Sequence, residues 1–212
     1  MMTHAYDEIH LDDAMETLGG AVEYATIFCN VNGQEFLDLF IASGVAEEYG
    51  RGNVKFISGM SGIELARYIL EKCGKTSSNI TEMPYIDYPP EYWIGWILAY
   101  YQWHTGKTFD SVCKKISYET LYNLYGVLHE ADPRKAVDVF DSIMQKNSET
   151  NLARLRKARG LSQSQLANKA DISIRSVQLY EQRKTDINKA QYNHLKSMAK
   201  VLGYVPEDLL ED

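Results

Sequence analysis

The spacing of hydrophobic residues predicts a chain built from α-helices. Between Leu11 and Cys29 they recur about every 3.6 residues, the repeat of an amphipathic helix. The Gly19-Gly20 pair is expected to kink or split that helix, because glycine has low helix propensity. Similar spacing, with starts at capping residues and stops at glycines, predicts further helices over 35–42, 62–73, 108–116, 117–128 and 134–146, with 45–49 as a possible extension of the second.

Two segments between these helices have a less regular pattern. Residues 54–58 alternate like a strand but have no partner strand in the sequence, and we expect a loop or a short extended piece there. Residues 75–90 are polar and rich in proline, which excludes a helix interior. They form either a hinge or a loop that is held in place by Tyr85 and Tyr88.

One segment, residues 91–106, is hydrophobic on nearly every side. A helix of this kind is buried on all sides, and it is too short to span a membrane. We therefore expect it to be the central helix of an N-terminal domain, where Gly95 lets a neighbouring helix cross closely. Its aromatic residues are expected to fill the core. Alternatives are a partner-binding face and an aromatic ligand cage around Trp93, Trp96 and Tyr100.

The C-terminal third contains three short helices in close succession, over 151–159, 163–170 and 174–182. Ser162 and Ser173 precede the second and third helices as N-caps, and Asp171-Ile172 forms the turn between them. Val177 and Tyr180 face the core at helical spacing. The opposite face of the third helix carries Ile174, Arg175, Gln178 and Leu179. A further helix over 188–202 and a last turn from Pro206 complete the segment.

The segments LSQSQLANKADISIRSVQLYEQRK and AKVLGYVPEDLL resemble the Cro/C1 (XRE) helix-turn-helix family of repressors. The resemblance covers about 60 residues and implies a five-helix lambda-repressor-like DNA-binding domain over 150–212. Together with the helices that the spacing predicts upstream, we expect an all-α protein with an acidic multi-helix domain over 1–147. Two residues depart from the family pattern. Asp171 stands where glycine is usual, and Arg183, where glycine or asparagine is usual, is expected to add a charge beside the DNA.

The third helix is expected to enter the major groove, because helix-turn-helix domains read bases with the N-terminal residues of that helix. In the family the glutamine matching Gln163 contacts phosphate, and Ser164, Lys184 and Lys189 are placed to do the same. The outward residues of this helix are expected to read the bases. Either Ile174 and Leu179 contact thymine methyl groups, or sequence specificity depends on Arg175 and Gln178 alone. The candidate DNA-binding residues are Gln163, Ser164, Ser173, Ile174, Arg175, Ser176, Gln178, Leu179, Lys184 and Lys189.

Charge is distributed unevenly along the chain. Residues 150–212 hold 11 Lys and Arg against 7 Asp and Glu, a net charge of +4, whereas residues 1–149 hold 11 against 22, a net charge of −11. A basic module joined to an acidic domain is typical of a DNA-binding protein with a second, non-DNA role. The alternative for residues 1–149 is that the 22 acidic side chains simply form a solvated surface.

Other features exclude several classes of protein. The three cysteines are far apart in the sequence, which predicts reduced thiols in a cytoplasmic protein and no disulfide framework. No apolar run is long enough for a membrane span, and no secretion signal is expected at the start. The histidines lack metal-ligand spacing, and no phosphate loop or hydrolase motif is present, so we expect no metal, no cofactor and no enzyme. Nothing in the sequence supports Cys113 with His104 or His129 as a nucleophile pair.

One such module reads few base pairs, so we expect a homodimer on a palindromic double-stranded operator. The layout resembles antitoxins that repress their own promoter and block a co-encoded toxin. The alternative is a repressor of the phage or mobile-element type, whose N-terminal domain senses a ligand or dimerises. An enzyme with a DNA-targeting module is the third possibility.

Overall fold

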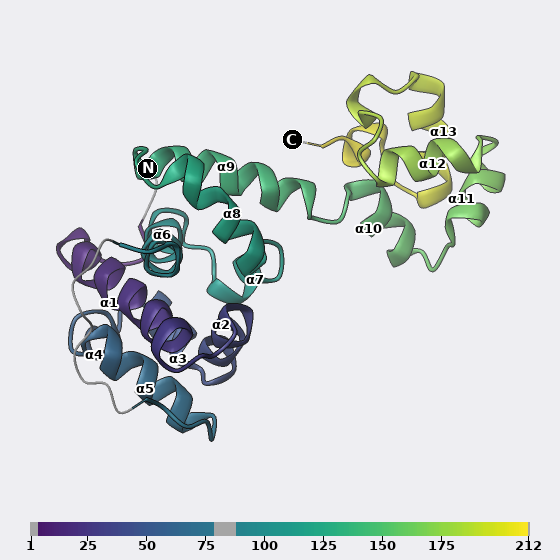
Figure 1. Cartoon of the computed structure of the whole chain (residues 1–212). Helices are drawn as coiled ribbons and strands as arrows, with labels where there is room; N and C mark the ends of the chain where they lie inside the picture. The colour runs from purple at the N-terminus through teal and green to yellow at the C-terminus, as the bar shows by residue number, and fades with distance from the viewer. Residues whose placement is uncertain (1–3, 79–87, 212) are drawn as a thin grey trace. The chain divides into compact units, whose positions relative to one another are not determined.

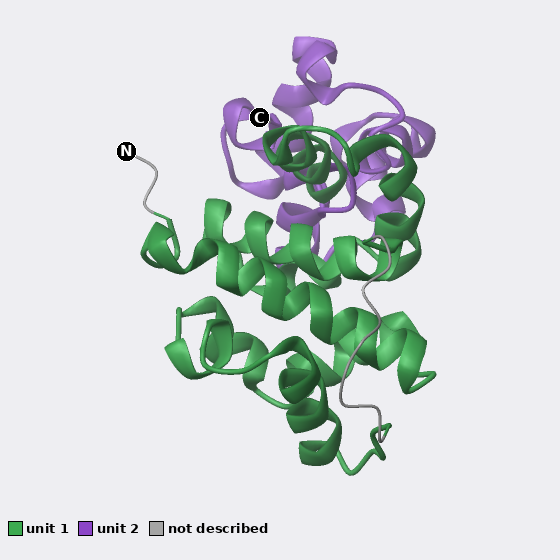
Figure 2. Ribbon diagram, turned by 60° about the vertical axis from the view of Figure 1, so that its left-hand side comes forward, with its two compact units in different colours: residues 1–145 green, residues 146–212 purple. Residues whose placement is uncertain are grey.

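The computed structural model describes residues 4–78 and 88–211. Within them every regular element is a helix or a helical turn, which confirms the all-α prediction. The chain separates into two compact units, residues 1–145 and 146–212 (Figure 2). Each unit has its own hydrophobic core.

The first unit is a helical domain around α1 and α6. Its helices are α1 (Leu11–Glu23), α2 (Gly33–Ala42), α3 (Val45–Gly50), α4 (Val54–Ile57), α5 (Gly62–Lys72), α6 (Pro90–Thr105), α7 (Phe109–Cys113), α8 (Tyr118–Leu128) and α9 (Pro133–Lys146), as Figure 1 shows, and a 3-10 turn, η1 (Glu8–His10), precedes them. Much of α6 is buried, including Trp93, Ile97 and Trp103. The hydrophobic segment is therefore part of the core, as predicted, although Trp96 and Tyr100 are only partly buried.

Glycines bring α1 close to α6. A methyl group added at Gly95 would lie 2.8 Å from the Cα of Gly19 and still closer to the Leu18 carbonyl. One added at Gly62, at the start of α5, would lie 2.6 Å from the carbonyl carbon of Gly20. The close crossing at Gly95 is as predicted. The Gly19-Gly20 pair, by contrast, does not interrupt α1, because the pair serves as the surface on which α5 and α6 pack.

Local hydrogen bonds correct several predicted boundaries. The first helix changes at Tyr24 into a single π-helical turn, η2 (Tyr24–Phe28), and the Cys29 N–H donates to the Tyr24 carbonyl. Residues 54–57 are helical rather than extended, because the Asn53 side chain caps the turn at the Lys55 N–H, 3.1 Å away. Gly44, with φ of 76°, separates α3 from α2.

The predicted 75–90 connection lies largely outside the described residues, which exclude 79–87 and with them Tyr85. Of its described part, the Tyr88 carbonyl accepts a hydrogen bond from the Tyr125 hydroxyl at 2.9 Å. This bond links the start of α6 to α8.

The second unit consists of α10 (Asn151–Ala158), α11 (Gln163–Ala170), α12 (Ile174–Glu181), η3 (Ile187–Lys189), α13 (Tyr192–Leu202) and η4 (Pro206–Leu209). The helix predicted over 188–202 is thus two elements, because Ala190 is extended with ψ of 152° between η3 and α13. The fifth helix is a single 3-10 turn. The core residues of this unit include Leu152, Leu166, Val177, Leu195, Met198, Leu202 and Leu209.

Among the described residues, no helix combines the length and the hydrophobicity that crossing a membrane requires.

Candidate nucleic-acid interface

Helices α11 and α12 begin at the capping serines that the sequence predicted. The Ser162 hydroxyl accepts from the Gln165 N–H at 3.1 Å, and the Gln165 side chain accepts from the Ser162 N–H at 2.8 Å. This reciprocal pair is a capping box, which satisfies two backbone donors at the start of α11. The Ser173 hydroxyl accepts from the Ser176 N–H at 2.9 Å at the start of α12.

The turn between the two helices depends on a left-handed residue and a small one. Asp171 ends α11 with φ of 55° and ψ of 46°, the conformation for which the family uses glycine. Ala167 is buried and Ile172 packs against the core. A small side chain at residue 167 lets α12 cross α11 closely, so the two helices form a helix-turn-helix.

The two sides of α12 differ sharply in exposure. Val177 and Tyr180 are buried, whereas Ile174 is 43% exposed and Arg175 is also exposed. Gln178 and Leu179 are half-buried. The outward face therefore consists mainly of the N-terminal residues of the helix, the part that helix-turn-helix domains direct at base edges.

The hydroxyl groups of Ser173 and Ser176 use part of their hydrogen-bonding capacity within the N-cap of α12. Their hydroxyl oxygens lie 2.8 Å apart, and Ser173 also accepts the backbone hydrogen bond at the helix start. Ser173 is exposed and Ser176 is half-buried. Both residues are thus at the N-terminal end of α12, with less free hydrogen-bonding capacity than the sequence alone indicates.

A charged network joins the ends of three helices. Arg156 of α10 donates to both carboxylate oxygens of Glu181 at 2.6 and 2.9 Å, and to the Leu161 carbonyl at 2.6 Å. The Arg156 and Glu181 side chains are only 10% and 6% exposed, and the hydrogen bond to Glu181 raises the pKa of the guanidinium. The Gln163 amide also donates to Glu181 at 2.8 Å.

This network changes the expected role of Gln163. One amide hydrogen is held by Glu181, so the side chain is fixed between the start of α11 and the end of α12, while Ser164 next to it is exposed. Arg156 was not among the residues predicted from the sequence. Its position four residues after Leu152, on the apolar face of α10, was a signal that it is buried and paired.

A comparison with protein families matches residues 152–210 to a helix-turn-helix model. Residues 152–210 belong to the Cro/C1-type helix-turn-helix family. The chain is accordingly a DNA-binding transcription regulator. Searches of curated proteins and of solved structures gave no match.

Arg183 of the helix-turn-helix unit is not a free charge at the interface, contrary to expectation. Its guanidinium donates to Glu211 at 2.6 Å and to the carbonyl oxygens of Lys146 and Ser148. Its φ is 51°, so it does occupy the left-handed position at which the family favours glycine or asparagine. These bonds fasten the end of α12 to both termini of the unit.

The two predicted phosphate-binding lysines follow α12. Lys184 and Lys189 are both exposed. The Lys189 ammonium lies 3.4 Å from an Asp186 carboxylate oxygen, and its side chain is 84% exposed. A surface pair of this kind contributes little to stability, so both lysines can approach a phosphate at small cost.

Outside the helix-turn-helix unit, Cys113 has the surroundings of a structural thiol. It is 9% exposed, and burial, together with the charges of Asp38 and Asp110, raises its pKa to about 12. The His129 ring nitrogen Nδ1 lies 2.8 Å from the Tyr125 carbonyl. Because a thiolate is required for nucleophilic attack, the Cys113 thiol is poorly suited to that role at neutral pH.

Proposed function

We propose that this DNA-binding regulator is a sequence-specific repressor that reads its operator with the outward face of α12. The exposure of that face carries the proposal. Ile174 is 43% exposed, and Arg175 makes no hydrogen bond or ion pair within the part of the chain that the structure describes. An arginine fits the acceptor edge of guanine, and an apolar side chain fits a thymine methyl group.

Arg175→Ala and Lys189→Ala are expected to affect DNA binding differently. Removing Arg175 should cost about 1–3 kcal/mol on the operator and little on unrelated DNA, because a base contact specifies sequence. Removing Lys189 should weaken binding to all sequences by a similar factor and reduce the salt slope by about 1. Gel shifts at several salt concentrations, on an operator selected from random DNA, measure both effects.

Arg134→Ala provides the matched control, because Arg134 is an exposed arginine of the first unit that is paired with Asp132 at 2.6 Å. It should leave operator affinity unchanged. Undiminished operator binding by Arg175→Ala would contradict the assignment of α12 as the base-reading helix.

The proposal includes a homodimer on a palindromic operator, because one unit of this size reads too few base pairs for useful specificity. Two half-sites about one helical turn apart are expected. Footprinting should give a symmetric protected region, and sedimentation should give two chains per operator. One chain per operator at saturation would exclude the dimer.

A second proposal concerns the first unit, whose 22 acidic residues against 11 basic ones over 1–149 suit a basic protein partner. In this proposal the chain is an antitoxin that represses its own promoter and blocks a co-encoded toxin. Co-expression with the neighbouring gene should yield a complex and relieve growth arrest caused by that gene product. Full growth arrest in the presence of the chain would leave the alternative, a repressor of the phage or mobile-element type.

A further inference from the structure

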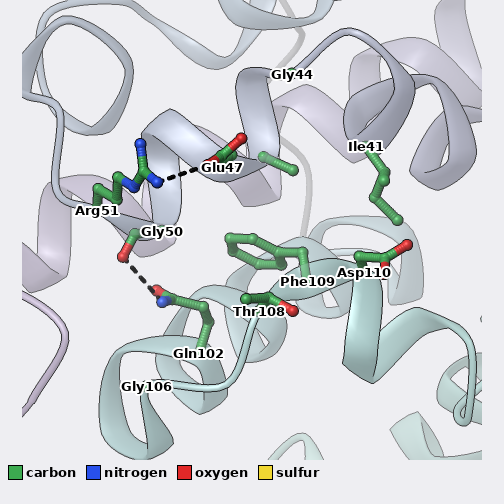
Figure 3. A pocket seen from close by; sticks show the side chains of 11 residues that line it. Ile41, Gly44, Glu47, Gly50, Arg51, Gln102, Gly106, Thr108, Phe109 and Asp110 are labelled. Atoms are coloured by element: carbon green, nitrogen blue, oxygen red, sulfur yellow. Dashed lines mark hydrogen bonds and ion pairs between the residues drawn. The ribbon is translucent and has the colours of Figure 1, made fainter.

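The first unit contains a pocket of about 450 Å³ between α2 and α3 on one side and the α6–α7 junction on the other, with Gln102 in its lining (Figure 3). The charged residues of the lining already have partners. Arg51 lies 2.6 Å from the Glu47 carboxylate, and the Asp110 carboxylate lies 2.6 Å from the Lys114 ammonium. Unpaired charges of the first unit are found instead near the start of α6.

Two carboxylates, those of Glu23 and Glu91, lie near each other without a basic partner. A methyl group added at Gly19 would lie 2.9 Å from the Tyr92 ring, so Glu23, one helical turn after Gly19, lies near the start of α6. Burial and the charge of Glu91 raise the pKa of Glu23. Both side chains are half-buried, and neither makes a hydrogen bond or an ion pair with residues in the described parts of the chain. A bound cation would therefore relieve the repulsion between them.

Near these carboxylates, α8 packs against α2 and α6 (Figure 1) and presents a row of aromatic side chains. Tyr118, Tyr122, Tyr125 and His129 recur at i, i+4, i+7 and i+11, which places them on one face of the helix. The ring centroids of Tyr118 and Tyr122 are 6.4 Å apart, and those of Tyr125 and His129 are 4.4 Å apart. Of α8, two leucines alone are buried, and Tyr122 is 45% exposed. The row is thus accessible to a partner.

Tyr118 connects the aromatic row to the carboxylates. Its ring is held against α2, because a methyl group added at Gly33 would lie 2.2 Å from that ring. Its N–H donates to the Gln34 side chain at 2.8 Å. Burial and the charge of Glu91 raise the pKa of the Tyr118 hydroxyl, so Glu91 lies close enough to this ring for electrostatic interaction. A positive group bound at Glu91 would therefore lie near an aromatic ring that is already in position.

An arginine side chain suits this combination of groups. Its guanidinium pairs with carboxylates and stacks on aromatic rings, and tyrosine is enriched among the residues that anchor protein partners. The net charge of −11 over residues 1–149 favours a basic partner. A second copy of the same acidic unit would instead bring like charges together.

We propose that the surface formed by Glu23, Glu91, Tyr118 and Tyr122 is a docking site for an arginine-bearing segment of a basic protein. An arginine of the partner lies between the two carboxylates, and the segment continues along the aromatic row of α8. This inference rests on the proposal that the first unit binds a basic protein, and it adds the surface and the side chain through which that protein binds.

Two synthetic peptides test the chemistry. One alternates glycine and arginine, and the other carries neutral citrulline in place of each arginine. With the arginine peptide, amide NMR spectra of the full chain should shift at Glu91, Tyr118, Tyr122 and their neighbours. The dissociation constant should be about 1 mM or lower, because each exposed contact is weak. The citrulline peptide should bind at least about tenfold more weakly.

Equal binding of the two peptides would overturn the proposal. So would the absence of shifts at these residues with the arginine peptide at about 5 mM. Shifts that appear there only when the concentration of the chain itself is raised would assign the surface to a second copy, which also overturns the proposal.

A double variant tests the carboxylates. Glu23→Gln with Glu91→Gln should weaken binding of the arginine peptide about fivefold or more, and it is expected to fold because it removes a repulsion. The control, Glu71→Gln with Asp138→Asn, changes the net charge equally at two exposed acids of α5 and α9. It should change binding less than about twofold. Equal weakening by both double variants would mean general attraction to the acidic unit and would overturn the proposal.

Tyr122→Leu tests the aromatic row, because it keeps an apolar side chain and removes the ring. The arginine peptide should bind about threefold more weakly. Tyr192→Leu, at an exposed tyrosine of the second unit, should change nothing. Unchanged binding by Tyr122→Leu would contradict the aromatic contact and the proposal with it.

The peptide assay needs no toxin, so it separates this surface from the antitoxin role. A chain that binds the arginine peptide here but does not relieve growth arrest would refute the antitoxin role alone. Full relief of growth arrest by the Glu23→Gln, Glu91→Gln variant would refute the docking site alone.

Discussion

At the residue scale, two residues of the helix-turn-helix unit other than glycine have a left-handed backbone conformation. Asp171 and Arg183 have φ values of 55° and 51°. Non-glycine residues adopt this conformation at a cost, which is smaller for Asp than for most others. At Arg183 three sets of guanidinium hydrogen bonds, to Glu211, Lys146 and Ser148, offset that cost. The family pattern identified both positions. It could not show that the Arg183 guanidinium is paired, because its partners are distant in sequence.

A residue-scale prediction concerns Ile174. Replacing a contacted thymine of the operator by deoxyuridine removes one methyl group, which should cost about 0.8 kcal/mol if Ile174 buries it. The Ile174→Ala variant should lose little more on the deoxyuridine operator, because the contact is already absent. Gel shifts over the four combinations of protein and operator measure this coupling.

Leu179→Ala is the companion variant, because Leu179 is the other apolar candidate and is half-buried. It should retain the sensitivity to deoxyuridine that Ile174→Ala loses. If every deoxyuridine operator binds with full affinity, sequence reading depends on Arg175 and Gln178 alone.

At the element scale, the close packing of α1, α5 and α6 depends on glycines, because glycine has no side chain to hold the helices apart. Backbone atoms of α1 lie within 3 Å of the positions that a Cβ would take at Gly62 and Gly95. The sequence pattern predicted a close crossing at Gly95 but indicated a break at Gly19-Gly20. Helix propensity disfavours glycine, and only the neighbouring helices show why the pair is retained within a continuous α1.

Gly95→Ala tests this packing. The added methyl group would meet the α1 backbone, which cannot move aside as a flexible side chain can, so we expect a loss of about 1–3 kcal/mol in the free energy of unfolding. Urea denaturation of the full chain measures the change.

Gly126→Ala is the matched control, since Gly126 lies in α8 and a methyl group added there would meet no described atom within 4 Å apart from its chain neighbours and the adjacent backbone of its own helix. There the alanine should stabilise the first unit by about 0.5–1 kcal/mol through helix propensity. A Gly95→Ala variant as stable as Gly126→Ala would contradict the close contact of α1 and α6.

At the scale of the whole molecule, the two units have separate cores. The core of residues 146–212 contains side chains from α10 to η4, and the core of the first unit ends with residues of α9 such as Phe140 and Met144. A unit that buries its own core can in principle fold alone. The helix-turn-helix unit is therefore expected to be stable without residues 1–145.

The fragment 146–212 should unfold in one cooperative thermal transition, followed by circular dichroism. A shorter fragment, 152–212, lacks Thr150, whose hydroxyl accepts from the Ala153 N–H at 3.1 Å, and it also lacks the Ser148 carbonyl that Arg183 contacts. Loss of the cap alone should cost about 1 kcal/mol. A fragment 146–212 without a cooperative transition would mean that the second unit needs the first.

Local sequence determined the helices, most of their caps and the helix-turn-helix, because periodicity and capping act over a few residues. The alternation at 54–58 misled for the same reason: so short a segment carries too little periodicity to distinguish a capped helical turn from a strand. Helical spacing already placed Arg156 on the apolar face of α10, but only the tertiary structure decided which acid pairs with which arginine, because these partners are distant in sequence. Arg156 and Arg183 lie within reach of Glu181 and Glu211, whereas Arg175 meets no acid in the described chain. The pocket at Gln102 likewise exists only because the fold brings α3 against α6 and α7.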